Sequence, residues 1–191
     1  MIDSLDQFIS INVNQESLNH QLETQNLNDL LEIEFEFQDQ YQKNEQLQEL
    51  SSKIKNKDEL KYLYVNWDQS TFCDTEGRVE RMIRLTSEMT RDLFQSQLPS
   101  IIPPGQTIEA KLTAEDKLKR NEAGVLEIAS PLLEATILEG ILEEEESKQF
   151  SLYLIIQVVD PSTPPRKGAF HFLCCEFKIE KIPWKTFLYW K

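Results

Sequence analysis

The sequence contains little cysteine and little glycine. It has three cysteines and five glycines among 191 residues, and two of the cysteines, Cys174 and Cys175, are neighbours. Adjacent cysteines rarely bridge one another, because a disulfide requires converging Cβ atoms, and an odd total leaves Cys73 or another thiol unpaired. We therefore expect reduced thiols and a cytoplasmic location.

Long apolar runs and a basic start are also missing. No run approaches the roughly 18 apolar residues that a membrane span requires. The first residues carry Asp3 and Asp6, where a secretory signal carries basic side chains. The sequence thus predicts no membrane partner.

Basic residues are outnumbered throughout the chain. Twenty Lys and Arg face 33 Asp and Glu, which gives a formal net charge of −13. Nine of these negative charges lie in residues 1–60, where four lysines face thirteen acids. Such a field repels phosphate backbones and attracts basic proteins. The composition therefore argues against nucleic-acid binding and in favour of a protein partner, for which a basic surface would be suitable.

The hydrophobic pattern predicts an α+β fold. Residues 31–37 alternate apolar and acidic side chains, as expected of a strand with one wet face. Residues 79–98 place apolar side chains three and four apart before Pro99, which favours a long amphipathic helix. We expect one domain over 1–191, with a mainly antiparallel sheet of five to seven strands. We expect the 79–98 helix and N-terminal helices to pack on one face of this sheet, with a loosely attached polar helical arm as the alternative arrangement for residues 1–30.

The remaining elements follow from the same patterns. Residues 39–60 predict a helix, and residues 132–142 favour a strand, with a helix as the alternative. A turn at 143–148 would join that strand to the next as a hairpin. Further strands are expected at 62–67, 107–113, 125–129, 150–159 and 168–181.

Four arginines mark the expected helix as a partner-binding surface. They are Arg78, Arg81, Arg84 and Arg91, and three of them are three residues apart, so they would form a short basic ridge. The alternative interpretation is that they pair internally with Glu76, Glu80 and Glu88, or with Glu32, Glu34 and Glu36.

The last residues supply a second candidate surface. The aromatic side chains Trp184, Phe187, Tyr189 and Trp190 lie in the final eight positions. They would either dock on the domain's own sheet or bind a partner, because Trp and Tyr dominate interface hot spots.

Two constellations suggest chemistry. Asp160, Glu176 and Lys178 resemble the Asp, then Glu-x-Lys order of metal-dependent nucleases, in which carboxylates hold Mg²⁺ and the lysine assists the attacking water. His171, Cys174 and Cys175 suggest a metal site, but on a strand only His171 and Cys175 share a face. The alternative interpretation is that Asp160, Glu176 and Lys178 belong to solvated surface, and that the thiols of the second set have only a structural role.

No nucleophile motif, nucleotide loop or complete metal cluster is present. We therefore predict a non-enzymatic cytoplasmic interaction module, such as an adaptor, assembly factor or inhibitor, with no cofactor and no metal. It would act through its acidic N-terminal third, the arginine-bearing helix and the aromatic tail. The alternatives are a Mg²⁺-dependent phosphodiesterase or nuclease, and an acidic sheet protein with a ligand pocket lined by Phe, Ile and Met.

Overall fold

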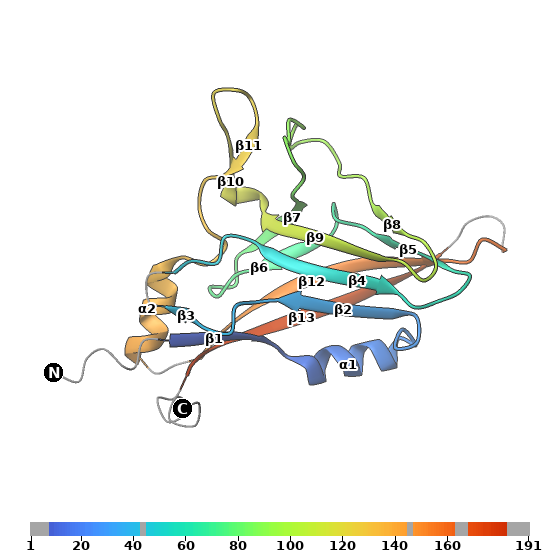
Figure 1. Ribbon diagram of the computed structural model, residues 1–191, viewed down its shortest axis with the longest axis horizontal. Coiled ribbons are helices and arrows are strands. Elements are labelled where there is room, and N and C mark those ends of the chain that lie inside the picture. Colours follow the sequence, from blue (N-terminus) through green and yellow to red (C-terminus); the bar gives the residue numbers. More distant parts are fainter. Residues whose placement is uncertain (1–7, 43–44, 145–146, 163–167, 183–191) are drawn as a thin grey trace.

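The computed structural model describes residues 8–42, 45–144, 147–162 and 168–182. Antiparallel strands dominate this part of the chain, and they form one large curled sheet (Figure 1). Nine strands follow one another across it in the order β2-β4-β9-β7-β6-β12-β13-β1-β3, with β5 and β8 attached beside β12. In chain order, these strands are β1 (Phe8–Val13), β2 (Leu31–Glu36), β3 (Tyr41–Gln42), β4 (Leu50–Asn56), β5 (Tyr62–Val65), β6 (Thr71–Cys73), β7 (Val79–Arg84), β8 (Ser100–Ile102), β9 (Thr107–Ala114), β12 (Lys148–Val159) and β13 (Ala169–Lys181).

Three smaller elements are attached to this sheet. Helix α1 (Gln15–Thr24) follows β1, and helix α2 (Ala135–Glu144) precedes β12. A separate hairpin consists of β10 (Leu118–Arg120) and β11 (Leu126–Ile128). None of the described helices is long and apolar enough to cross a membrane.

The α+β prediction with a long helix is wrong. Residues 79–98 form the short strand β7 followed by an irregular segment, residues 85–99, which we call the 85–99 loop. Met82 enters the main core, while the next residue, Ile83, packs on the opposite face in a second cluster with Met89. A strand that is apolar on both faces gives the three-and-four spacing that resembles a helix.

The other helix predictions also need correction. Residues 39–60 contain β3 and β4, not a helix; Leu50 and Ile54 face the core, but buried Ser52 and Asn56 interrupt the apolar alternation. The N-terminal region contains a strand, β1, before its single described helix. Residues 132–142 contain most of α2, so the preferred strand and its hairpin to β12 are wrong and the helical alternative holds.

Several strand predictions are confirmed. β2 matches the alternating segment 31–37, with Leu31 and Ile33 buried and Glu34 and Glu36 exposed. The strands expected at 62–67, 107–113, 125–129, 150–159 and 168–181 correspond to β5, β9, β11, β12 and β13. These segments alternate clearly or are continuously apolar, and both patterns indicate strands.

The core lies inside the curl, where the β2-β4-β9-β7 part of the sheet faces the β12-β13-β1 part (Figure 1). Aromatic rings join the two parts. Phe177 of β13 stacks on Phe150 at 4.8 Å between ring centroids and meets Phe35 of β2 edge-on at the same distance. Phe72 packs against Phe150 at 5.7 Å. These contacts fix β2 against β13 without hydrogen bonds between the two strands.

The sheet is interrupted beside β12. β5 and β6 pair with β12 one after the other, and residues 66–70 leave the sheet between them. β8 pairs with β5, and β7 pairs with β6, each on the side away from β12. The 85–99 loop therefore starts and ends on either side of this interruption.

Candidate functional site

The interruption is filled by Trp67, whose side chain is fully buried. Its indole Nε1 donates a hydrogen bond to Ser100 Oγ at 2.7 Å. The same oxygen accepts a hydrogen bond from Arg84 Nη1 at 2.8 Å. A single hydroxyl thus holds the end of β7 and the start of β8 against the buried ring.

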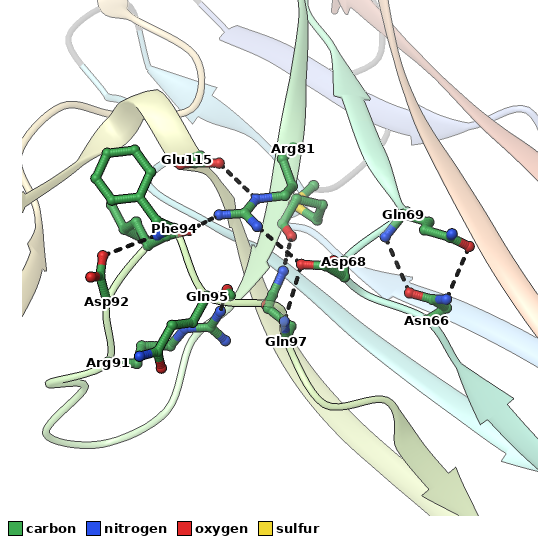
Figure 2. Close-up of polar contacts among 12 residues, drawn as sticks. Asn66, Asp68, Gln69, Arg81, Arg91, Asp92, Phe94, Gln95, Gln97 and Glu115 are labelled. Atoms are coloured by element: carbon green, nitrogen blue, oxygen red, sulfur yellow. Dashed lines mark hydrogen bonds and ion pairs between the residues drawn. The ribbon is translucent and has the colours of Figure 1, made fainter.

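Arg81 forms a clamp beneath the 85–99 loop (Figure 2). Its Nη1 lies 3.0 Å from Asp68 Oδ1, and its Nε lies 2.7 Å from Glu115 Oε2. Its Nη2 donates to the carbonyl of Leu93 in the loop. The arginine side chain is only 23% exposed, so these pairs are more strongly coupled than surface ion pairs.

Gln97 attaches the end of the loop to the part of β7 that lies beyond its pairing with β6. Its side-chain Nε2 donates to Met82 O at 2.6 Å, and its Oε1 accepts from the backbone N–H of Arg84 at 3.0 Å. Its own N–H donates to Asp68 Oδ1 at 3.0 Å. One buried amide therefore supplies the two hydrogen bonds that a neighbouring strand would otherwise provide.

The charges of the clamp are shifted by their surroundings. Desolvation alone would raise the pKa of Asp68, but the Gln97 N–H and the Arg81 guanidinium outweigh it and lower that pKa below its ordinary value of 3.8. Desolvation likewise opposes the charge of Arg81, yet Glu115 and Asp68 raise its pKa. In both cases, the partners in the clamp stabilise the ionised form of the side chain.

Beside this clamp lies a depression of about 340 Å³, which we call the arginine depression. Arg84 and Arg91 line it together with Trp67 and residues 95–98. Arg91 Nη2 donates to Gln95 O at 2.7 Å, while its buried Nε has no hydrogen-bond partner. The site therefore offers the guanidinium groups of Arg84 and Arg91 to an anionic group.

Two large apolar side chains of the 85–99 loop are exposed, and one of them, Leu98, lines the arginine depression. Phe94 is 95% exposed and Leu98 is 86% exposed. Figure 2 shows the Phe94 ring pointing away from the polar network, while the Phe94 N–H donates to Asp92 Oδ1 at 3.0 Å. The backbone of the loop is thus fixed while its largest ring is left in solvent.

The β10–β11 hairpin supports the far end of the loop. Met89 packs with Ile83, Leu118 and Leu126 in the second apolar cluster. Arg120 Nη2 donates to Arg91 O at 2.7 Å, and its Nη1 donates to Thr90 O at 3.3 Å. The loop is therefore held at both ends and in the middle.

The predicted arginines do not form the expected ridge. Arg84 and Arg91 meet at the arginine depression, whereas Arg81 is used internally. Arg78 lies in the turn before β7 and pairs with two carboxylates. Its Nε lies 2.8 Å from Asp74 Oδ2, and its Nη2 lies 3.2 Å from Glu76 Oε2. Among the described residues, two of the four arginines, Arg78 and Arg81, thus form internal ion pairs. Of the glutamates that the sequence suggested as their partners, only Glu76 takes part. The predicted tail residues Trp184, Phe187, Tyr189 and Trp190 lie outside the described residues.

Asp160, Glu176 and Lys178 are not brought together. Glu176 opposes Ser151 on β12, whereas Asp160 follows the end of that strand, a separation of about 30 Å at roughly 3.3 Å per residue. Lys178 Nζ lies 2.5 Å from Glu180, and Glu176 accepts from Asn14 Nδ2 at 3.2 Å. This arrangement contains no site for a shared Mg²⁺.

The His171, Cys174 and Cys175 set also stays apart on β13. Cys175 is fully buried in the core, where desolvation raises its thiol pKa and keeps it neutral. Cys174 lies on the other face, and desolvation raises its pKa as well. In the part of the chain that the structure describes, no three His, Cys, Asp or Glu side chains are grouped to hold a metal ion.

Sequence reasoning missed Phe94 and Leu98 as surface residues, because the helical interpretation placed both on a buried stripe. Pro99 and the polar residues Gln95–Gln97 were the available signal for an irregular segment. The chain matches no protein-family model, and neither a curated protein nor a solved structure is significantly similar to it.

Proposed function

We propose that this chain is a non-enzymatic cytoplasmic interaction module that binds another protein through the 85–99 loop. The observation that carries this proposal is the exposure of Phe94 and Leu98 on the same loop that contributes Arg91 to the arginine depression. Exposed aromatic rings next to arginines are the residue types that dominate binding energy at protein interfaces.

The loop is prepared for binding before a partner arrives. The Arg81 clamp, the Gln97 amide and Arg120 fix its backbone. A surface that is already ordered loses less conformational entropy on association, so more of the contact energy appears as affinity.

The chemistry of this surface defines the contact that it suits. A partner carboxylate would lie in the arginine depression beside the guanidinium groups of Arg84 and Arg91, and an apolar side chain of the partner would pack on Phe94 or Leu98. Charge-assisted hydrogen bonds and apolar burial would then act together.

Two further parts of the chain belong to the same proposal. The acidic N-terminal third would steer a basic partner, and the aromatic tail at 184–190 would add hot-spot residues. The cytoplasmic location is supported by the three cysteines, all of which are free.

The test compares proteins captured by the wild-type chain with those captured by a double variant, Phe94→Ser with Leu98→Ser. The matched control is Leu60→Ser, which replaces another exposed leucine, 73% exposed, outside the loop. We expect a stoichiometric partner to be lost from the double variant and retained by the control. The affinity measured with the purified partner should fall about a hundredfold and should fall further at high salt. A captured set that is unchanged by the double substitution would contradict the proposal.

A further inference from the structure

β2 is an edge strand of the curled sheet. It stands at the end of the strand order, and among the described residues it pairs only with β4. The Lys57 N–H donates to Leu30 O at 2.8 Å in the same register. Because peptide groups alternate in direction along an antiparallel pair, those of Glu32, Glu34 and Glu36 point toward β4. Those of Ile33 and Phe35 point away from it.

A groove runs along this free edge. A space of about 390 Å³ separates α1 from β2, and Leu22 of α1 lines it together with Leu31 and Ile33 of β2. α1 is fastened to the other side, because the Gln21 and Gln25 side chains bind the backbone of β13. Figure 1 shows α1 beside β13, next to β2 in the curl.

The charges beside the groove are mainly acidic. Glu32 and Glu34 of β2 and Glu23 of α1 line it, opposed by Lys57, whose Nζ donates to Asn28 O. Glu36 continues the same row and lies 2.5 Å from Lys53 Nζ. A second copy of this chain would bring glutamates against glutamates, which is destabilising across strands. The excess of carboxylates at this edge therefore favours a basic occupant.

From this geometry, we infer that β2 binds an extended protein segment in which basic and apolar residues alternate. The N–H and C=O groups of Ile33 and Phe35 would pair with its backbone as an additional strand. Its apolar side chains would enter the groove beside Leu22 and Ile33, since opposite residues share a face. Its lysines or arginines would lie next to Glu32, Glu34 and Glu36.

The test uses a synthetic peptide of alternating lysine and valine, about as long as β2. Titrated into isotope-labelled protein, it should shift the amide signals of residues 31–36 and slow hydrogen exchange at Ile33 and Phe35. Methylating the peptide nitrogens that face β2 should weaken binding about tenfold or more, whereas methylating the alternate nitrogens should weaken it less than about twofold. A peptide of alternating glutamate and valine should not bind.

Charge variants locate the contact. Glu34→Lys should weaken binding of the lysine–valine peptide about fivefold at low salt. The control is Glu109→Lys, which changes a 76% exposed glutamate opposite Lys53, on the other side of β4, and should leave binding within about twofold. Equal effects of the two variants, equal effects of the two methylation patterns, or no binding at low salt would each overturn the inference. The last result would mean that the acidic edge only repels other strands.

The binding inferred for β2 and the binding proposed for the 85–99 loop can be tested independently, because the two surfaces are separate. β4 and β9 lie between β2 and β7, from which the 85–99 loop departs. Phe94→Ser with Leu98→Ser should therefore leave peptide binding unchanged. Loss of peptide binding in that variant would place the contact on the loop and overturn the edge-strand inference.

Discussion

The side-chain amide of Gln21 pairs with the backbone of Cys174 as a neighbouring strand would. Gln21 Nε2 donates to Cys174 O at 2.8 Å, and Gln21 Oε1 accepts from the Cys174 N–H at 2.8 Å. β1 stops pairing with β13 at Phe177, so the helix that follows β1 continues the pairing with side chains. The exposed edge of β13 is thereby closed to other chains.

Gln21→Ala should lower the free energy of unfolding by about 1–2 kcal/mol, because both backbone groups of Cys174 lose a protein partner. Chemical denaturation measures this change. The matched control is Gln15→Ala in the same helix. The Gln15 Nε2 donates to Asn19 Oδ1 at an exposed position, and losing this bond should change stability by less than about 0.5 kcal/mol. Similar losses in the two variants would contradict the role assigned to Gln21.

Arg81→Met should destabilise the protein by about 2 kcal/mol, since it leaves Asp68 and Glu115 partly buried without their cation. Arg78→Met removes an arginine from the surface, where its side chain is 67% exposed, and should lower the melting temperature far less than Arg81→Met. Thermal unfolding of the wild type and both variants under the same conditions measures the two losses of stability. A larger loss at Arg78 than at Arg81 would refute the clamp.

The lowered pKa of Asp68 predicts that the folded protein loses stability at acid pH. Its pKa in the folded protein lies below 3.8, although desolvation opposes this shift, because Gln97 and Arg81 stabilise the carboxylate. Above about pH 5 the carboxylate is ionised in both the folded and the unfolded state, and its full stabilisation is present. As the pH falls through the unfolded value, protons bind the unfolded chain first, so this stabilisation is lost.

The pH dependence is tested with Asp68→Asn. The gap in unfolding free energy between wild type and variant should be widest near neutral pH and should narrow as the pH falls below about 4. Glu122→Gln, at an exposed position in the β10–β11 turn, serves as the control and should follow the wild-type curve. A gap that is independent of pH would show that charge at Asp68 is not what stabilises the loop.

Two phenylalanines should respond to the same change with losses of stability of very different size. Phe177→Leu removes the ring that packs on Phe35, Phe37 and Phe150, and should lower stability by about 1–3 kcal/mol. Phe94→Leu changes a ring that stands in solvent and should alter stability by less than about 0.5 kcal/mol. If Phe94→Leu proves as damaging as Phe177→Leu, the ring of Phe94 is not a free surface.

The strands were predictable from the sequence where only one face is apolar or where the whole strand is buried. The alternation of Leu31 to Phe37 and the apolar run from Phe150 to Val159 identified β2 and β12. β7 was hidden because Met82 and Ile83 enter two different clusters on its two faces. β4 was hidden because the core accepts Ser52 and Asn56, whose polar atoms bond the backbone at Ala110 and Ile102.

The candidate site was predictable only in part. The arginines attract attention in so acidic a chain, but their division into Arg81 as a clamp and Arg84 with Arg91 as a surface depends on distant partners. Glu115 lies far along the sequence from Arg81, and Ser100 comes from the strand after the loop. Local periodicity contains no information about such pairings.

The pairing of β1 with β13 has a consequence for biosynthesis. Ile9 lies opposite Lys181, so β1 cannot pair with β13 until almost the whole described chain has left the ribosome, although its short pairing with β3 can form earlier. Contacts this distant in sequence slow folding and prolong the exposure of unpaired strands. We therefore expect in vitro refolding to be slow and to yield less native protein as concentration rises.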